Sequence, residues 1–347
     1  MDRVTRFAAV NTKIRALEGD FLKNQHYVEM LRQKSIQELA GYLKENTPYR
    51  KLLGDINPDA VNRATLEEIL RRNMVNNLDK LLYFFYGTYR EFLKALYLKY
   101  EIEDLKNLAR DIYNNSKSDL ENRPYSFIGK YSKVSSEHVL KAVTLREFIL
   151  ALEGSEFYDY VEPLLDGKRE NLFRLEMALD MAYFSILKKS SEKLEKGDRK
   201  IVEEYEGMVS DLYNLQWIYR GKKYYMLSPE ELLNYTIDMG NRINFFKRRQ
   251  LCYSRNLEEL NNMARELGYG FLFKKEETGD IYMERRINRF LYYRLRALSK
   301  RYPMSIIQAI AYTQFLEFEI RDIISIAECI RYNLSPEESG RFLIRVL

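Results

Sequence analysis

The feature that most constrains the fold is a pattern that occurs three times along the 347-residue chain. The segment Glu101–Leu108 matches Met208–Leu215, and both match Glu319–Ile326. The shared aspartates, 107 and 111 residues apart, are Asp104, Asp211 and Asp322. Within each copy the apolar residues fall three or four positions apart, which indicates one face of an amphipathic helix. Self-similarity at a fixed period predicts a repeat architecture.

A second pattern marks the start of a helix in each copy. A Ser, Thr or Asn is followed three residues later by a glutamate, as in a capping box. The pairs are Ser35 with Glu38, Thr144 with Glu147, and Asn256 with Glu259. The first side chain should accept a hydrogen bond from a free backbone N–H, and the glutamate should reach back to the N–H of the cap residue itself. A tyrosine-bearing turn follows each pair, with Tyr49, Tyr158 and Tyr269.

A third, weaker pattern lies between the other two. An aliphatic residue and an Asp or Asn precede an aromatic residue by one helical turn, in the segments 78–83, 179–184 and 287–292. The three patterns occur in the same order in each copy. We therefore expect an all-α protein of three similar helical-bundle domains, residues 1–118, 119–228 and 229–347, related by pseudo-threefold repetition. Such units can form a linear array or a funnel, and a funnel would offer its central opening to a rod-shaped partner.

The composition agrees with helices and narrows the range of partners. Only 7 prolines and 15 glycines occur in the chain, so residues that break helices are scarce. The net charge of +5 permits contact with an acidic partner, but nucleic-acid-binding proteins carry a stronger local basic stripe. We therefore expect no nucleic-acid binding. No stretch approaches the roughly 18 apolar residues of a membrane-spanning helix, so we also expect no direct membrane span.

The common catalytic motifs are missing together. The chain has two histidines and two cysteines without metal-ligand spacing, and it has no glycine-rich phosphate loop. We therefore expect no catalytic residues, no bound metal and no cofactor. A helical enzyme with an unrecognised site stays an alternative, and it predicts one deep pocket with convergent ionisable residues.

Two segments that combine cations with aromatic rings are candidate partner contacts. The candidates are Asn214, Trp217, Arg220, Lys222 and Lys223 in the first segment, Lys247, Arg248 and Arg249 in the second (after Phe245 and Phe246), and Arg331 farther on. For both segments the alternative is a helix C-terminus whose cations complement the helix dipole, with Gly221 ending the first helix. The three repeated aspartates could line a central opening, cap buried segments or form ion pairs between repeats.

Several of these residues resemble a known family. The segment Asn11–Gly19 is similar to its opening N-x-R/K-V/I-R-A, and Thr47–Tyr49 is similar to its T-x-Y turn. The segment Asp211–Lys222 resembles its helix D-I/L-x-N-I/L-x-x-x-x-R-x-K. With the period near 110 residues, the whole chain resembles the C subunit of A-type and V-type ATPases (ATP synthases), the family that includes the d subunit of eukaryotic V-ATPases.

This resemblance implies a non-catalytic central-stalk subunit on the cytoplasmic face of a membrane. One copy per complex would link the rotor shaft, made of the D and F subunits, to the proteolipid c-ring and transmit torque for ATP-coupled proton or sodium transport. The sequence departs from the family at Lys13, where arginine is common, and at Tyr113, where the other repeats carry Arg220 and Arg331. A generic helical-repeat adaptor outside rotary ATPases is the main alternative.

Overall fold

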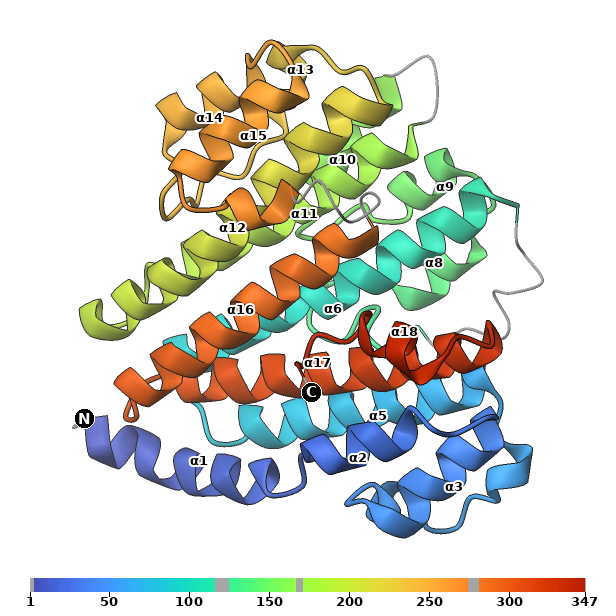
Figure 1. The fold of residues 1–347 in the computed structure, drawn as a ribbon. Helices are drawn as coiled ribbons and strands as arrows, with labels where there is room; N and C mark the ends of the chain where they lie inside the picture. Colours follow the sequence, from blue (N-terminus) through green and yellow to red (C-terminus); the bar gives the residue numbers. More distant parts are fainter. Residues whose placement is uncertain (1–2, 116–124, 167–170, 274–280, 347) are drawn as a thin grey trace. The chain divides into compact units, whose positions relative to one another are not determined.

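The computed structural model describes residues 3–115, 125–166, 171–273 and 281–346 (Figure 1). These residues form helices joined by turns, and no strand occurs among them, which confirms the all-α prediction. The chain divides into two compact units. Unit 1 combines the two ends of the chain, residues 1–84 and 274–347, and unit 2 is the continuous segment 85–273.

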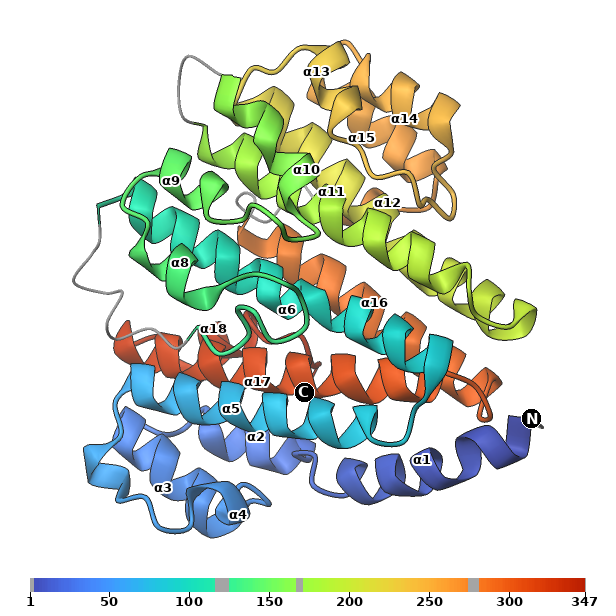
Figure 2. The same ribbon diagram turned by 180° about the vertical axis from the view of Figure 1, so that it is seen from behind.

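Unit 1 is built from an N-terminal group of helices and a C-terminal group. Its α-helices are α1 (Arg3–Glu18), α2 (Asn24–Met30), α3 (Ile36–Asn46), α4 (Arg50–Leu53), α5 (Arg63–Leu82), α16 (Ile281–Arg301), α17 (Ile307–Arg331) and α18 (Pro336–Gly340), with the short 3-10 helix η1 (Pro58–Ala60). Helix α17 packs against α1, α3 and α5 from the N-terminal group and against α16 and α18 from its own (Figure 2). The two ends of the chain therefore share one core.

Unit 2 contains three long helices, α6, α11 and α12, and short helices follow α6 and α12. Its α-helices are α6 (Gly87–Tyr113), α8 (Ser136–Lys141), α9 (Leu145–Leu150), α10 (Tyr158–Val161), α11 (Leu172–Ser191), α12 (Lys196–Tyr224), α13 (Pro229–Asn234), α14 (Phe245–Cys252) and α15 (Leu257–Glu266), with the 3-10 helices η2 (Glu162–Asp166) and η3 (Gly270–Phe273). The predicted order of capping-box helix, Asp/aromatic helix and aspartate helix recurs as α3–α5–α6, α9–α11–α12 and α15–α16–α17.

The pairing of α6 with α11 shows how the long helices are held. Their apolar faces are buried, and Leu105, Leu108 and Leu179 have no exposed surface. Full burial of a leucine side chain contributes about 1.5–3 kcal/mol. At the edge of this contact the ammonium of Lys106 lies 3.0 Å from the carboxylate of Asp180. Burial opposes the charged form of Lys106, but the attraction of Asp180 raises its pKa above the ordinary value.

The predicted caps are present, but the glutamates bond one residue earlier than expected. Ser35, Thr144 and Asn256 each accept a hydrogen bond from the backbone N–H of their glutamate, at 3.0, 3.1 and 2.9 Å. Each glutamate carboxylate then accepts the N–H of the residue before the cap, at 2.8, 2.8 and 2.6 Å. The expectation that it bonds the N–H of the cap residue itself is wrong. The same departure in all three copies is further evidence that they are related.

The helix C-terminus considered as the alternative for each candidate segment is confirmed only in part. Lys222 and Lys223 do lie in the last turn of α12, but the helix continues past Gly221 to Tyr224. Gly221 lies inside the helix at a close contact, because a Cβ atom there would meet Leu232 Cδ2 at 2.3 Å. In α14, whose N-cap is Asn244, Lys247 and Arg248 lie in the first half of the helix, and only Arg249 lies in its last turn.

The three-domain division stays a prediction. Its first boundary, at Ser118, lies outside the described residues, and Ser228 at the second is the N-cap of α13. The pseudo-threefold relation and the central opening likewise stay predictions.

The shared geometry of the caps gives a first test. Replacing Asn256 with alanine should lower the free energy of unfolding by about 1 kcal/mol, because the N–H of Glu259 loses its acceptor. Urea denaturation followed by circular dichroism measures the change. The matched control is Asn262→Ala on the exposed face of α15, which should not destabilise the protein. Equal destabilisation by both substitutions would refute the role of the cap.

Candidate functional site

Asp211 holds the segment that follows its helix. Its carboxylate accepts the backbone N–H groups of Arg242 and Ile243, at 2.7 and 3.2 Å, and the hydroxyl of Tyr269 at 2.8 Å. Gly240 allows this approach, because a Cβ atom there would lie 2.1 Å from the carbonyl oxygen of Ile243. Burial raises the pKa of Asp211, and the hydrogen bonds oppose that rise. We call such a carboxylate, with the backbone it holds, a clamp.

The other two repeated aspartates form clamps of the same kind. Asp104 accepts the N–H of Phe127 at 2.9 Å. Asp322 accepts those of Ile344 and Arg345, at 2.7 and 3.2 Å. All three aspartates are buried. Of the three roles considered for them, the structure supports the capping of buried segments.

A glutamate one turn earlier extends two of the clamps, and it is not among the residues predicted from the sequence. Glu101 accepts hydrogen bonds from Gly129 N–H at 2.8 Å and from the hydroxyl of Ser132. Glu319 accepts the N–H of Leu22 at 2.7 Å and the hydroxyl of Tyr49 at 3.0 Å. The signal was present, because these glutamates begin the first and third copies of the repeated pattern, whereas the second copy begins with a methionine.

Two of the candidate contact residues on α12 are held inside unit 2. Asn214 is buried and exchanges two hydrogen bonds with the backbone of Ile237, at 3.0 and 2.8 Å. Trp217 is buried and stacks on Tyr213 with ring centroids 6.1 Å apart. Neither side chain is therefore available to a partner on the surface of unit 2.

Two candidate cations bond the backbone in the same way. Arg248 is buried, and its guanidinium donates to the carbonyl of Ile237 and to the carboxylate of Asp238. Lys222 donates to the carbonyl of Ser254 at 2.8 Å, and partial burial lowers its pKa. Both cations therefore connect α12 and α14 to the loops beside them.

The remaining candidates are more accessible. Arg220 is half-buried, whereas Lys223, Lys247, Arg249 and Arg331 are exposed. The guanidinium of Arg331 lies over the ring of Tyr332, 4.9 Å from its centroid, and forms an ion pair with Glu328 at 3.4 Å.

Two neighbouring phenylalanines complete a surface on α14. Phe245 is 52% exposed and Phe246 is 73% exposed, and their rings meet edge to face. We call Phe245, Phe246, Lys247 and Arg249 the α14 surface. Exposed aromatic side chains beside cations are typical of protein contact sites. The α14 surface is therefore a candidate for partner contact in unit 2.

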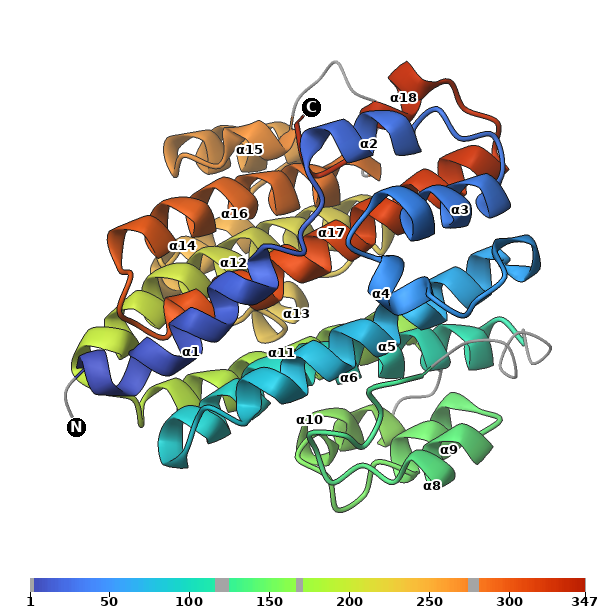
Figure 3. The same cartoon turned by 90° about the horizontal axis from the view of Figure 1, so that it is seen from below.

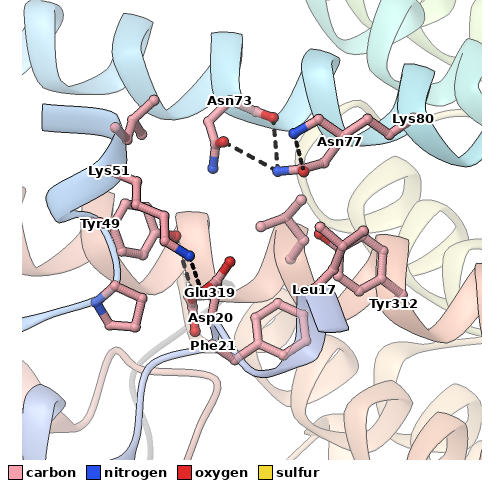
Figure 4. A pocket seen from close by; sticks show the side chains of 13 residues that line it. Leu17, Asp20, Phe21, Tyr49, Lys51, Asn73, Asn77, Lys80, Tyr312 and Glu319 are labelled. Atoms are coloured by element: carbon pink, nitrogen blue, oxygen red, sulfur yellow. Dashed lines mark hydrogen bonds and ion pairs between the residues drawn. The ribbon is translucent and has the colours of Figure 1, made fainter. Parts of the chain in front are cut away.

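Unit 1 contains a pocket of about 230 Å³ beside the Glu319 clamp (Figure 4). Apolar side chains, among them Phe21 and Tyr312, form part of its wall. The carboxylate of Glu319 and the amide of Asn77 also line it, and an ion pair between Lys51 and Asp20, 3.1 Å long, lies at its edge. Among the described residues, no group of three His, Cys, Asp or Glu side chains could hold a metal ion.

None of the helices in the described part of the chain combines the length and the apolar character needed to cross a membrane.

Comparison with known proteins gives matches along nearly the whole chain. The family model described as "ATP synthase (C/AC39) subunit" matches residues 10–342. The C subunit of the A-type ATP synthase of Methanocaldococcus jannaschii is 23% identical over 346 residues, which cover 97% of this chain and 86% of the relative. The C subunit of the A-type ATP synthase of Pyrococcus horikoshii is 26% identical over 347 residues, covering 97% and 90%. The similarity thus includes both units.

Replacing Asp211, which accepts three hydrogen bonds, should destabilise the protein. Asp211→Ala leaves two buried donors and one partly buried donor without their acceptor, so we expect the free energy of unfolding to fall by about 3 kcal/mol. Urea unfolding measures it. The control Asp159→Ala, at an exposed position of the same unit, should change it by less than about 0.5 kcal/mol. A small effect of Asp211→Ala would mean that the clamp does not stabilise the fold.

Proposed function

The chain belongs to the ATP synthase (C/AC39) subunit family, and from this membership we propose that it is a non-catalytic central-stalk subunit of a rotary A/V-type ATPase. One copy would sit on the cytoplasmic face of the membrane, held there by the complex. It would receive the rotor shaft, made of the D and F subunits, and rest on the proteolipid c-ring, so that torque passes through it. The observation that carries the proposal is the family match over residues 10–342.

The helical construction supports a mechanical role. An element that transmits torque must resist bending, and here the long helices α6, α12 and α17 run for 27, 29 and 25 residues. Each is connected by a buried clamp to a segment outside itself, so it cannot rotate independently of its short helices. Buried, hydrogen-bonded carboxylates of this kind fix one geometry, because an unpaired alternative would leave the charge buried alone.

The α14 surface supports a contact role within this function. A three-part socket cannot match the symmetry of a ring of many identical proteins. We therefore propose several modest contacts, made by exposed aromatic and cationic side chains such as Phe246 and Arg249, rather than one deep hot spot. Lys223 and Arg331 belong to the same proposal, whereas the buried Asn214, Trp217 and Arg248 would act by holding the surface in shape.

A generic helical-repeat adaptor is the runner-up. Family membership over both units counts against it, because the curated relatives are named as ATP synthase subunits.

The binding partners provide the test of function. The purified chain should retain the D and F subunits, and separately the detergent-solubilised c-ring, in a pull-down. Binding to neither would contradict the coupling role.

Variants of the α14 surface test how the contact is distributed. If contacts are many and modest, Lys247→Ala alone should weaken binding to its partner by less than about tenfold, which corresponds to about 1.4 kcal/mol. The triple variant Phe246→Ala, Lys247→Ala, Arg249→Ala should weaken it further. Surface plasmon resonance measures both.

The control for these variants is Lys193→Ala, an exposed lysine of the same unit outside the α14 surface, which should bind as the unmodified chain does. Complete loss of binding in the single variant, with its circular dichroism unchanged, would contradict the distributed contact. Unchanged binding affinity in the triple variant would show that the α14 surface does not contact the partner.

A further inference from the structure

In unit 1 the clamp on α17 holds both ends of the chain. Glu319 accepts the N–H of Leu22, and Asp322, one turn later, accepts that of Ile344. The guanidinium of Arg345 also donates to the carbonyl of Leu22 at 2.6 Å, so the two ends are bonded to each other. In Figure 3 the segment that follows α18 ends near the start of α2.

The matching clamp in unit 2 differs in one respect. Glu101 holds residues 129–132, which follow its own helix along the chain. Glu319 instead holds Leu22 and Tyr49, which come from the opposite end of the chain. The N-terminal segment is therefore joined to α17 by non-covalent contacts alone, which are the hydrogen bonds to Glu319 and the packing of α3 on α17.

Glu319 can gain or lose a proton in place, because space adjoins it. The pocket of about 230 Å³ reaches it from one side, between α1, α5 and α17. A second cavity of about 60 Å³, lined also by Asp322 and Arg345, reaches it as well. Polar cavities of this size have room for water.

The hydrogen bonds around Glu319 can rearrange when the carboxylate takes up a proton. A tyrosine hydroxyl can donate or accept. Tyr49 can therefore donate to the carboxylate or accept the proton of the carboxylic acid, while the other oxygen keeps the N–H of Leu22. Protonation adds one donor, so the hydroxyl hydrogen of Tyr49 then needs another acceptor, and the adjoining pocket, which both residues line, has room for a water molecule.

The surroundings favour the neutral acid. Burial raises the pKa of Glu319 to about 7; the hydrogen bonds from Leu22 and Tyr49 and the charge of Arg345 oppose this, and the charge of Asp322 adds to it. Burial likewise raises the pKa of Asp322 to about 6. The other titratable or charged groups in this part of unit 1 are Tyr27 and His26 on α2, Arg289 and Tyr292 on α16, Tyr312 on α17, Lys80 on α5, and Asp20 and Lys51 at the pocket edge.

We propose that Glu319 is a proton-controlled latch, which binds the N-terminal segment Leu22–Tyr49 to α17 while it is protonated and releases that segment more readily once it is ionised.

The direction follows from proton linkage. In the closed latch the pKa of Glu319 is about 7, and in an open, solvated state it returns towards the ordinary 4.5. The closed state then binds more protons, so its stability falls as the pH rises from about 4.5 to about 7 and levels off above that. For one such group, the opening constant rises about tenfold between pH 6 and pH 8.

Hydrogen–deuterium exchange tests the latch. Peptides that contain Leu22 to Tyr49 are followed at pH 6, 7 and 8, and the rates are corrected for intrinsic exchange. We expect the opening constant of these peptides to rise about tenfold in the unmodified chain, and to stay constant with pH in Glu319→Gln. An unmodified chain whose corrected exchange does not change with pH overturns the proposal, without reference to any variant.

Matched variants assign the effect to one carboxylate. Glu101→Gln changes the equivalent clamp of unit 2, and His26→Gln removes the imidazole of α2, so both should keep the tenfold rise. A rise that persists in Glu319→Gln, or disappears in His26→Gln, overturns the assignment. If Glu319→Gln does not fold, as judged by circular dichroism, Glu319→Met replaces it in the same comparison with the same expected flat profile.

Discussion

The interaction on which the rest of the structure depends is the clamp, a buried carboxylate on a long helix that accepts backbone N–H groups from a segment outside that helix. It occurs at Asp104, Asp211 and Asp322. A buried carboxylate is costly unless it is fully hydrogen-bonded, so each clamp allows one position of its loop. The short helices beside the loop are then fixed relative to the long one. In unit 1 the same interaction connects the two ends of the chain, which are far apart in the sequence, to one helix.

Much of the fold could be predicted from the sequence, because its main signals are local. Apolar spacing located the long helices, and the Ser35, Thr144 and Asn256 caps located the starts of α3, α9 and α15. The errors occur where the local pattern does not determine the contact. Gly221 looked like a helix end but accommodates Leu232, a contact that depends on tertiary packing. The capping glutamates bond one residue earlier than expected, which the sequence pattern alone does not distinguish.

The candidate site was harder to predict, because exposure is a tertiary property. Arg248 and Lys247 are adjacent cations, yet one is buried against Asp238 and the other faces solvent. The partners of Glu319 lie 297 and 270 residues away in the chain, so no pattern in one sequence could join them. The repeated pattern identified the three clamp aspartates, but it did not show which backbone N–H groups they bind. The prediction of function depended instead on motifs at residues 11–19, 47–49 and 211–222 that resemble those of a known family. The family match confirmed that resemblance.

The central claim is that this chain couples the rotor shaft to the c-ring. The most direct measurement is cryo-electron microscopy of the intact A/V-type complex purified through a tag on this chain. The account predicts density for one copy between the lower end of the shaft and the cytoplasmic face of the ring, with contacts to both. Density at the periphery of the complex, or contact with only one of the two, would contradict it.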